Sequence, residues 1–159
     1  MKNKITPLVL LMLIGCSEPV ENAETDVTKT EYEYSITENK QISWDEVLSK
    51  SKSRYVVYFY SEYCGYCKQV KQEVLSYYLK NVDEMYFIDT VKEKAVYKSN
   101  DGVLIGTKNI TDFYIFGTPF LVEVTNYTVT NWYAGVDSIR LYIDTRTNNK
   151  KLFLLKLNE

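Results

Sequence analysis

The chain has 159 residues, of which 45% are hydrophobic, 25% charged and 14% aromatic, and its formal net charge is −2. With 15 tyrosines and only six glycines, this composition suits one globular domain with short appendages and excludes a fibrous or wholly disordered protein. The chain has no histidine, which excludes Cys–His and Ser–His catalysis, imidazole metal ligands and a histidine pH switch.

The first 15 residues have the pattern of a bacterial signal peptide. Lys2 and Lys4 supply positive charge, and Pro7–Ile14 is an apolar run too short for a spanning helix, which needs about 20 residues. The run ends in Leu13-Ile14-Gly15-Cys16, which resembles the lipobox, the signal whose cysteine is lipidated with fatty acids such as palmitate and becomes the first mature residue. The alternatives are an ordinary signal peptide with a chance cysteine and an uncleaved anchor.

The lipobox resemblance has consequences for location and charge. It implies that Cys16 anchors the protein to the extracytoplasmic face of the cell membrane, where disulfides persist. Cys64 and Cys67 then remain as one redox pair. Without residues 1–15, the chain keeps 17 basic and 21 acidic side chains, a net charge of −4, which argues against a nucleic-acid partner. We expect a monomer.

Residues 16–40 predict an acidic flexible tether, followed by a folded domain over residues 41–159. Large aliphatic side chains are few in this tether, and it carries seven acidic ones: Glu18, Glu21, Glu24, Asp26, Glu31, Glu33 and Glu38. Tyr32, Tyr34 and Ile36 alternate with polar residues, a pattern that would also suit a short edge strand.

The first half of the domain alternates between helix and strand signals. Ser43-Trp44-Asp45-Glu46 is a capping-box pattern that predicts a helix over Trp44–Ser51. Arg54–Ser61 is β-branched and aromatic, the composition of a strand buried on both faces. Lys68–Leu79 has apolar residues at helical spacing, and Met85–Asp89 predicts another buried strand.

A polar insertion separates the two halves of the domain. It covers residues 91–109, with a hairpin expected around Asp101-Gly102. The next segment, Ile110–Phe116, predicts a short helix.

The second half predicts a hairpin and a terminal helix. Phe120–Thr125 and Val129–Ala134 should pair antiparallel through a turn at Asn126-Tyr127. A last helix, capped by Asp137 or Ser138, is expected to end near Asp144, and Lys151–Leu157 suits either a strand or a helical extension.

The motif Cys64-Gly65-Tyr66-Cys67 lies between the first strand and its helix. Two thiols separated by two residues at a helix start can pass between dithiol and disulfide with little backbone movement. The helix N-terminus also stabilises the thiolate of the first cysteine. Zinc sites use the same spacing, but the chain has no second such motif and no histidine to complete four ligands, so we expect no metal.

The predicted element order resembles the thioredoxin fold, an α/β fold with a central mixed sheet flanked by helices. The resemblance covers roughly residues 42–145. The segment Tyr58–Lys68, with aromatic residues around the first cysteine, looks like the thioredoxin active-site segment. Thr118-Pro119 matches the family's cis-proline, which faces the disulfide and is uncommon elsewhere, at about 5–6% of such bonds.

The resemblance implies a role for each motif residue. Cys64 would be the nucleophile that forms the mixed disulfide, and Cys67 would be the resolving thiol. Gly65 and Tyr66 would tune the redox loop.

Further residues would contact the substrate. Thr118 and Pro119 would present their backbone to an extended substrate and keep metals away from the dithiol. Tyr63 and Tyr66 should be exposed and able to touch the same substrate.

Two departures from the family bear on the chemistry. Tyr58 stands where thioredoxins carry a buried acid, and we expect it to be a packing residue, with a proton relay as the alternative. Gly-Tyr between the cysteines, with Thr118 before the proline, is similar to bacterial periplasmic disulfide isomerases, although the chain lacks their dimerisation domain.

The sequence therefore predicts a membrane-anchored, extracytoplasmic thiol–disulfide oxidoreductase. Its partners would be exported cysteine-containing proteins or peptides and a membrane redox partner, and its only redox group would be the dithiol. The alternative is an accessory lipoprotein of a peptide or bacteriocin export system that mainly binds a client. A copper- or haem-maturation protein ranks last, because Met85 is the only methionine of the mature chain.

Overall fold

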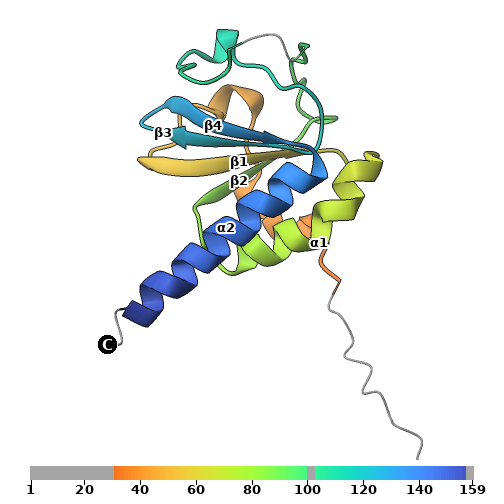
Figure 1. Ribbon diagram of the computed structural model, residues 1–159. Helices are drawn as coiled ribbons and strands as arrows, with labels where there is room; N and C mark the ends of the chain where they lie inside the picture. The colour runs from red at the N-terminus through yellow and green to blue at the C-terminus, as the bar shows by residue number, and fades with distance from the viewer. Residues whose placement is uncertain (1–30, 100–102, 157–159) are drawn as a thin grey trace, which may run out of the picture.

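The computed structural model describes residues 31–99 and 103–156. Its centre is a mixed sheet in the order β2-β1-β3-β4 (Figure 1). β1 (Arg54–Tyr60) runs parallel to β2 (Met85–Asp89) and antiparallel to β3 (Phe120–Thr125), which pairs antiparallel with β4 (Thr128–Ala134). The predicted mixed α/β sheet is thus confirmed.

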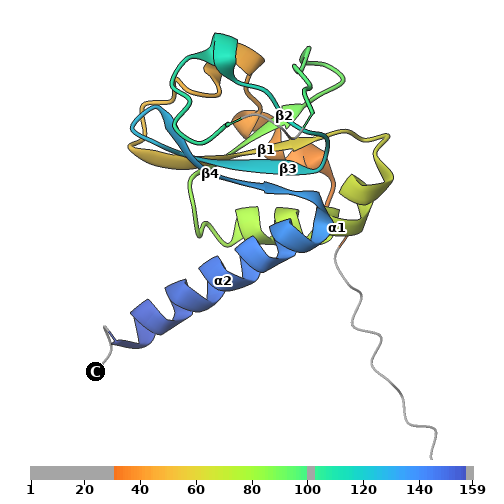
Figure 2. The same ribbon diagram turned by 45° about the horizontal axis from the view of Figure 1, so that its top comes forward.

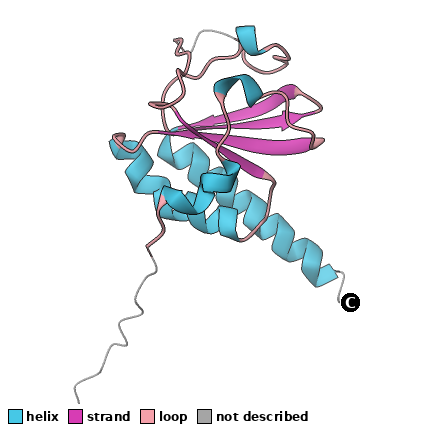
Figure 3. Ribbon diagram, turned by 180° about the vertical axis from the view of Figure 1, so that it is seen from behind, coloured by secondary structure: helices cyan, strands magenta, loops and turns pink. Residues whose placement is uncertain are grey.

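Helices and loops cover opposite faces of this sheet. α1 (Gly65–Leu79) and α2 (Gly135–Lys156) lie together on one face, and the other face is covered by loops and short 3-10 turns (Figures 2 and 3). β1 lies between the two layers and is buried on both sides. Tyr58 and Cys67 belong to the core beneath the helices, whereas Phe59 belongs to the core beneath the loops.

The β3–β4 hairpin follows from its turn residues. Asn126 and Tyr127 both have positive φ, 47° and 62°, as a two-residue hairpin of this handedness requires. The turn lies where the sequence predicts it, and β4 pairs with β3 over the expected residues.

The N-terminal boundary of the domain differs from the prediction. A 3-10 helix, η1, covers Tyr34–Lys40, so an edge strand over Tyr32–Ile36 is wrong. Tyr34 is buried because its ring stacks on Tyr60, with 3.7 Å between the ring centroids. The folded domain therefore begins before residue 41, and residues 34–40 belong to it and not to a flexible tether. The signal segment, Cys16 and the tether up to residue 30 lie outside the described residues.

The helix predicted over Trp44–Ser51 is reduced to a 3-10 turn, η2 (Trp44–Glu46). The capping glutamate is in place, because the Glu46 carboxylate accepts the Ser43 N–H at 2.9 Å and the Ser43 hydroxyl at 3.1 Å. The Tyr55 hydroxyl donates to the carbonyl oxygen of Val47, the residue at which this turn ends, at 2.9 Å.

The segment between β2 and β3 contains less helix than predicted. Only η3 (Ile110–Asp112) forms, because Phe113, Tyr114 and Ile115 are consecutively buried, and a helix would turn one of them outward. Ile115 instead bridges to the 91–99 stretch, where its N–H donates to the oxygen of Val96 at 2.9 Å. The hairpin predicted around Asp101-Gly102 lies outside the described residues.

α2 is longer than the predicted final helix. It begins at Gly135, before the expected caps Asp137 and Ser138, and it continues past Asp144 to Lys156. Of the two alternatives for the C-terminal stretch, the helical extension is thus the one observed. No helix in the described part of the chain combines the length and apolar character that crossing a membrane requires.

Candidate active site

Cys64 occupies the N-cap position of α1, as the sequence predicts. Its backbone is extended (φ −79°, ψ 116°), and its Sγ accepts a hydrogen bond from the N–H of Cys67 at 3.1 Å. The loop before it is held by Ser61, whose carbonyl oxygen accepts the Cys64 N–H at 3.1 Å and whose hydroxyl accepts the Tyr63 N–H at 3.2 Å. The loop that follows β1 thus places Cys64 at the N-terminus of α1.

Thr118-Pro119 lies against the cysteine pair. The Thr118–Pro119 peptide bond is cis, and Pro119 is buried. The Cys64 thiol donates to the carbonyl oxygen of Thr118 at 3.2 Å. The structure therefore brings together the two motifs, 54 residues apart, that the sequence analysis linked only by resemblance.

The two thiols differ in exposure and in acidity. Both are free; Cys64 is half-buried, whereas Cys67 is only 1% exposed. Burial opposes ionisation of Cys64, but hydrogen bonds from the side chains of Cys67 and Thr118 and from the N–H groups of Cys67 and Tyr66 outweigh it and lower the pKa of Cys64. Burial, and then the hydrogen bond with Cys64, raise the pKa of Cys67. Cys64 is therefore ionised to the thiolate more readily than Cys67.

The residues around the pair leave it open to solvent on one side. Tyr63 and Tyr66 are 83% and 66% exposed, which fits the predicted substrate contact. A side chain at Gly65 would meet nothing within 4 Å, so packing does not require glycine there. In the described part of the chain, no three acidic or cysteine side chains gather in a way that could hold a metal.

Tyr58 is fully buried beneath the cysteines, in the same core cluster as Cys67. It packs edge-on against Phe87, with ring centroids 6.0 Å apart, and parallel to Tyr60 at 6.1 Å. These contacts fit the packing role that we expected. Its hydroxyl, however, has no hydrogen-bond partner among the described residues.

A comparison with models of protein families matches the part of the chain that contains the two cysteines. The family model described as thioredoxin matches residues 35–103, a stretch that contains β1, both cysteines, α1 and β2. This stretch is similar to thioredoxin in sequence, and the mixed sheet with its flanking helices is the thioredoxin fold. The family match and the fold together support a thiol–disulfide oxidoreductase, with the direction of transfer open.

Several solved structures resemble the thioredoxin-like domain at low sequence identity. They include thioredoxin f2 from Chlamydomonas reinhardtii, with 18% identity over 68% of this chain and 94% of that one and a TM-score of 0.46. A thioredoxin from Malassezia sympodialis has 18% identity over 68% and 87%, with a TM-score of 0.48. Oxidised mitochondrial thioredoxin 3 from Saccharomyces cerevisiae has 13% identity over 65% and 89%, with a TM-score of 0.47. No curated protein matches the chain.

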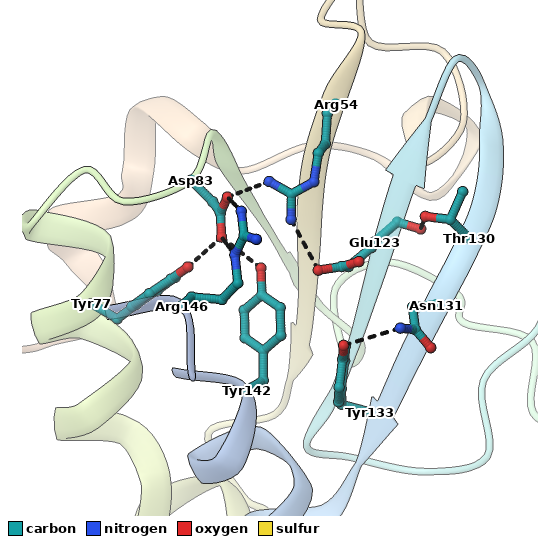
Figure 4. Close-up of polar contacts among 9 residues, drawn as sticks. All are labelled: Arg54, Tyr77, Asp83, Glu123, Thr130, Asn131, Tyr133, Tyr142 and Arg146. Atoms are coloured by element: carbon teal, nitrogen blue, oxygen red, sulfur yellow. Dashed lines mark hydrogen bonds and ion pairs between the residues drawn. The ribbon is translucent and has the colours of Figure 1, made fainter. Parts of the chain in front are cut away.

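A charged cluster around the buried Asp83, which no sequence pattern predicted, lies where β1 and β2 begin, at the other end of these strands from the cysteines. Figure 4 shows its side chains. The Asp83 carboxylate accepts hydrogen bonds from Arg54, Arg146, Tyr77 and Tyr142; the Tyr142 hydroxyl lies 2.6 Å and the Arg146 Nη2 2.8 Å from its oxygens. Burial opposes the charge, but these donors outweigh it and hold the pKa of Asp83 well below its usual range.

This cluster joins four elements that are distant in sequence. The two arginines come from β1 and α2, the two tyrosines from α1 and α2, and the carboxylate from the residue pair before β2. No local pattern pairs an aspartate with an arginine 63 residues away, so sequence reasoning had no signal for it. With all its oxygens bonded, the cluster is suited to holding the helical layer to the sheet.

Proposed function

We propose that this protein is a membrane-anchored, extracytoplasmic thiol–disulfide oxidoreductase that exchanges disulfides with exported proteins through Cys64 and Cys67. The observation that carries the proposal is the asymmetry of the pair. Cys64 is reachable, sits on a helix N-terminus and has a lowered pKa, whereas Cys67 is buried and has a raised one. One thiol is thus prepared to attack and the other to resolve.

The exchange follows from this geometry. The Cys64 thiolate attacks one sulfur of a client disulfide, the client S–S bond breaks, and the second client sulfur leaves as a thiolate that takes up a proton. Cys67 then loses its proton to water and attacks the Sγ of Cys64, releasing the first client sulfur as a thiolate that takes up a proton from water. The pair ends as a disulfide, and the client has gained two electrons and two protons. Run in reverse, the same steps oxidise a client dithiol.

The client would lie along the exposed edge of the site. The buried Pro119 fixes the backbone of Thr118 beside Cys64, and the Thr118 carbonyl oxygen already accepts a hydrogen bond from that thiol. An extended client segment could pair with this backbone. Tyr63 and Tyr66 stand exposed on either side of Cys64 and offer aromatic contact area to it.

The membrane anchor rests on the sequence. The apolar run that stops at Cys16 supports lipidation there, and an extracytoplasmic location is where exported proteins acquire and exchange disulfides. A membrane redox partner would reset the Cys64–Cys67 pair after each turnover.

Trapping in cells tests the proposal. In a Cys67→Ser variant of the full chain, mixed disulfides should accumulate, because nothing resolves the bond at Cys64. We expect reducible adducts with exported, cysteine-containing proteins in the membrane fraction. The matched Cys64→Ser variant should give none. If the two variants give equal amounts of adduct, or if neither gives any, the proposed exchange is contradicted. Such a result would favour the client-binding lipoprotein of an export system instead.

A further inference from the structure

Two buried hydroxyl groups lie in the core cluster of Cys67 without a hydrogen-bond partner. Among the described residues, the only buried side-chain oxygen or nitrogen atoms without a partner are the hydroxyls of Tyr34 and Tyr58. Both residues belong to the buried cluster that contains Cys67. A buried hydroxyl without a partner destabilises the fold, and natural structures contain few such groups.

The three tyrosines of this region differ in how their hydroxyls are used. Tyr60 stacks between the other two, with centroids 3.7 Å from Tyr34 and 6.1 Å from Tyr58. Its own hydroxyl accepts a hydrogen bond from Gln41 Nε2 at 3.0 Å. The hydroxyls of Tyr34 and Tyr58 lie close enough to affect each other's acidity, but no hydrogen bond of normal geometry joins them. Packing alone would be served as well by phenylalanine at 34 and 58, since the rings make the packing contacts. We therefore expect these hydroxyls to gain a hydrogen-bond partner in another state of the site.

That partner arises in the exchange reaction itself. In either direction of the proposed function, Cys67 passes through a thiolate, as the attacking group in reduction of a client and as the leaving group in oxidation. A thiolate that is only 1% exposed cannot be solvated by bulk water and needs nearby donors. Two phenol groups in the same buried cluster can donate hydrogen bonds to it without carrying charge.

We propose that Tyr58, supported by Tyr34, is a positioning residue that stabilises the thiolate of Cys67 during exchange. The proposal rests on the proposed function and adds to it a role for a tyrosine that stands where a buried acid would otherwise be. It also makes the N-terminal segment around η1 part of the redox site.

The acidity of the phenols is consistent with this role. Burial, and then the charges of neighbouring groups that include Cys67, raise the pKa of Tyr58 well above its ordinary value. Burial likewise raises the pKa of Tyr34. Both side chains therefore keep their protons and act as hydrogen-bond donors, not as bases that remove the proton from Cys67, which goes to water.

A two-step reaction separates the two cysteines. The reduced full chain is mixed with an aromatic disulfide reagent that releases a coloured thiolate at each step. The first thiolate leaves when Cys64 attacks the reagent, and the second leaves when Cys67 attacks the Cys64 mixed disulfide. The reagent gains two electrons, and the pair becomes a disulfide.

We expect Tyr58→Phe to slow the second release by about tenfold or more and to leave the first within about twofold, since a hydrogen bond to a charged group is lost only at Cys67. Tyr34→Phe should slow the second release less, and the double variant at least as much as Tyr58→Phe. Because the Tyr58 hydroxyl is unpaired in the dithiol state, the reduced Tyr58→Phe chain should be as stable as the unmodified one or more so, so a slower second release cannot be attributed to a loss of stability.

Tyr55→Phe is the matched control. It removes a hydroxyl from the same strand on the opposite face, where that hydroxyl donates to Val47, and it should leave the ratio of the two steps unchanged. If Tyr58→Phe and the double variant slow neither step, or slow both equally, the role of the tyrosines is overturned while the proposed function stands. If the unmodified chain releases no second thiolate, both are overturned.

Discussion

The thiol of Cys64 donates a hydrogen bond to the carbonyl oxygen of Thr118, at 3.2 Å. This contact joins the N-terminus of α1 to the residue pair that leads into β3, so the nucleophile and the backbone expected to receive a client belong to one site. It also places the Thr118 side chain where it influences the acidity of the thiol.

Replacing Thr118 should weaken the Cys64 thiolate. The Thr118 side chain is one of the groups that lower the pKa of Cys64, and valine keeps its shape without the hydroxyl. We expect Thr118→Val to raise the pKa of Cys64 and to slow its alkylation at neutral pH severalfold. The measurement is the alkylation rate against pH. Thr128→Val, at the start of β4 and away from the cysteines, is the control and should leave the rate unchanged.

The two cysteines should be alkylated over different pH ranges. In a Cys67→Ser chain the Thr118 side chain and the N–H groups of residues 66 and 67 still lower the pKa of Cys64, and the serine hydroxyl can donate in place of the Cys67 thiol. Cys64 should therefore be alkylated at a pH below the usual thiol pKa of about 8.5. Because burial raises the pKa of Cys67, the Cys64→Ser chain should react only above that range. Mass spectrometry after timed alkylation gives both profiles. Overlapping profiles would contradict the asymmetry on which the proposed function rests.

Asp83 should stabilise the fold above about pH 4. Its folded-state pKa is lowered, so the stabilisation is full above the unfolded value of about 3.9 and is lost as the pH falls through the folded value. Because the side chains of Arg54 and Arg146 are 34% and 33% exposed, Asp83→Asn leaves no fully buried charge and is expected to lower the free energy of unfolding by about 1.5–3 kcal/mol. Urea unfolding at neutral pH should show this loss for Asp83→Asn.

The matched control for Asp83 is the exposed ion pair of Glu73 with Arg140, at 3.0 Å. Exposed pairs contribute about 0–1 kcal/mol, so Glu73→Gln should change the unfolding free energy little. Equal effects of the two substitutions would show that the buried cluster does not hold the helices to the sheet.

Truncation should locate the start of the folded domain. A chain lacking residues 1–30 keeps Tyr34 and also Tyr32, whose N–H donates to Gln72 Oε1 at 2.8 Å. A chain lacking residues 1–40 loses both, and burial of one large side chain is worth about 1.5–3 kcal/mol. We therefore expect the shorter chain to lose at least about 2 kcal/mol in urea unfolding, relative to the longer one. Equal stability of the two truncated chains would show that the folded domain begins at residue 41, as the sequence predicts.

Cys16→Ser should release the protein from the membrane. Lipidation at that residue is the anchor that the lipobox resemblance implies, and the substitution removes the acceptor sulfur. Labelling with radioactive palmitate, followed by membrane fractionation, should show label and membrane association in the parent chain and neither in the variant. Membrane association that survives in the variant would contradict the lipoprotein assignment.

Much of the sheet could be predicted because its signals are local. The strand bounds Met85–Asp89 and Phe120–Thr125 agree with the sequence patterns, and the hairpin follows from the two turn residues between β3 and β4. The cysteine pair was found for the same reason, since its spacing and its place before a helix are both readable along the chain.

The remaining features depend on contacts between distant residues. The ring of Tyr34 stacks on that of Tyr60, and the Tyr55 hydroxyl bonds to the Val47 carbonyl oxygen where the turn after Ser43 ends. Neither partner is visible in the local sequence. The unpaired hydroxyl of Tyr58 is likewise a property of the packed core, so its role could be proposed only from the structure.

The reduction potential of the Cys64–Cys67 pair tests the central claim most directly. The full chain is equilibrated with reduced and oxidised glutathione, and the fraction of oxidised pair is measured, with Cys64→Ser as the blank. We predict reversible exchange with a potential between the about −270 mV of thioredoxin and the about −120 mV of strong oxidants. A pair that does not exchange with glutathione at any ratio would contradict the assignment as a thiol–disulfide oxidoreductase.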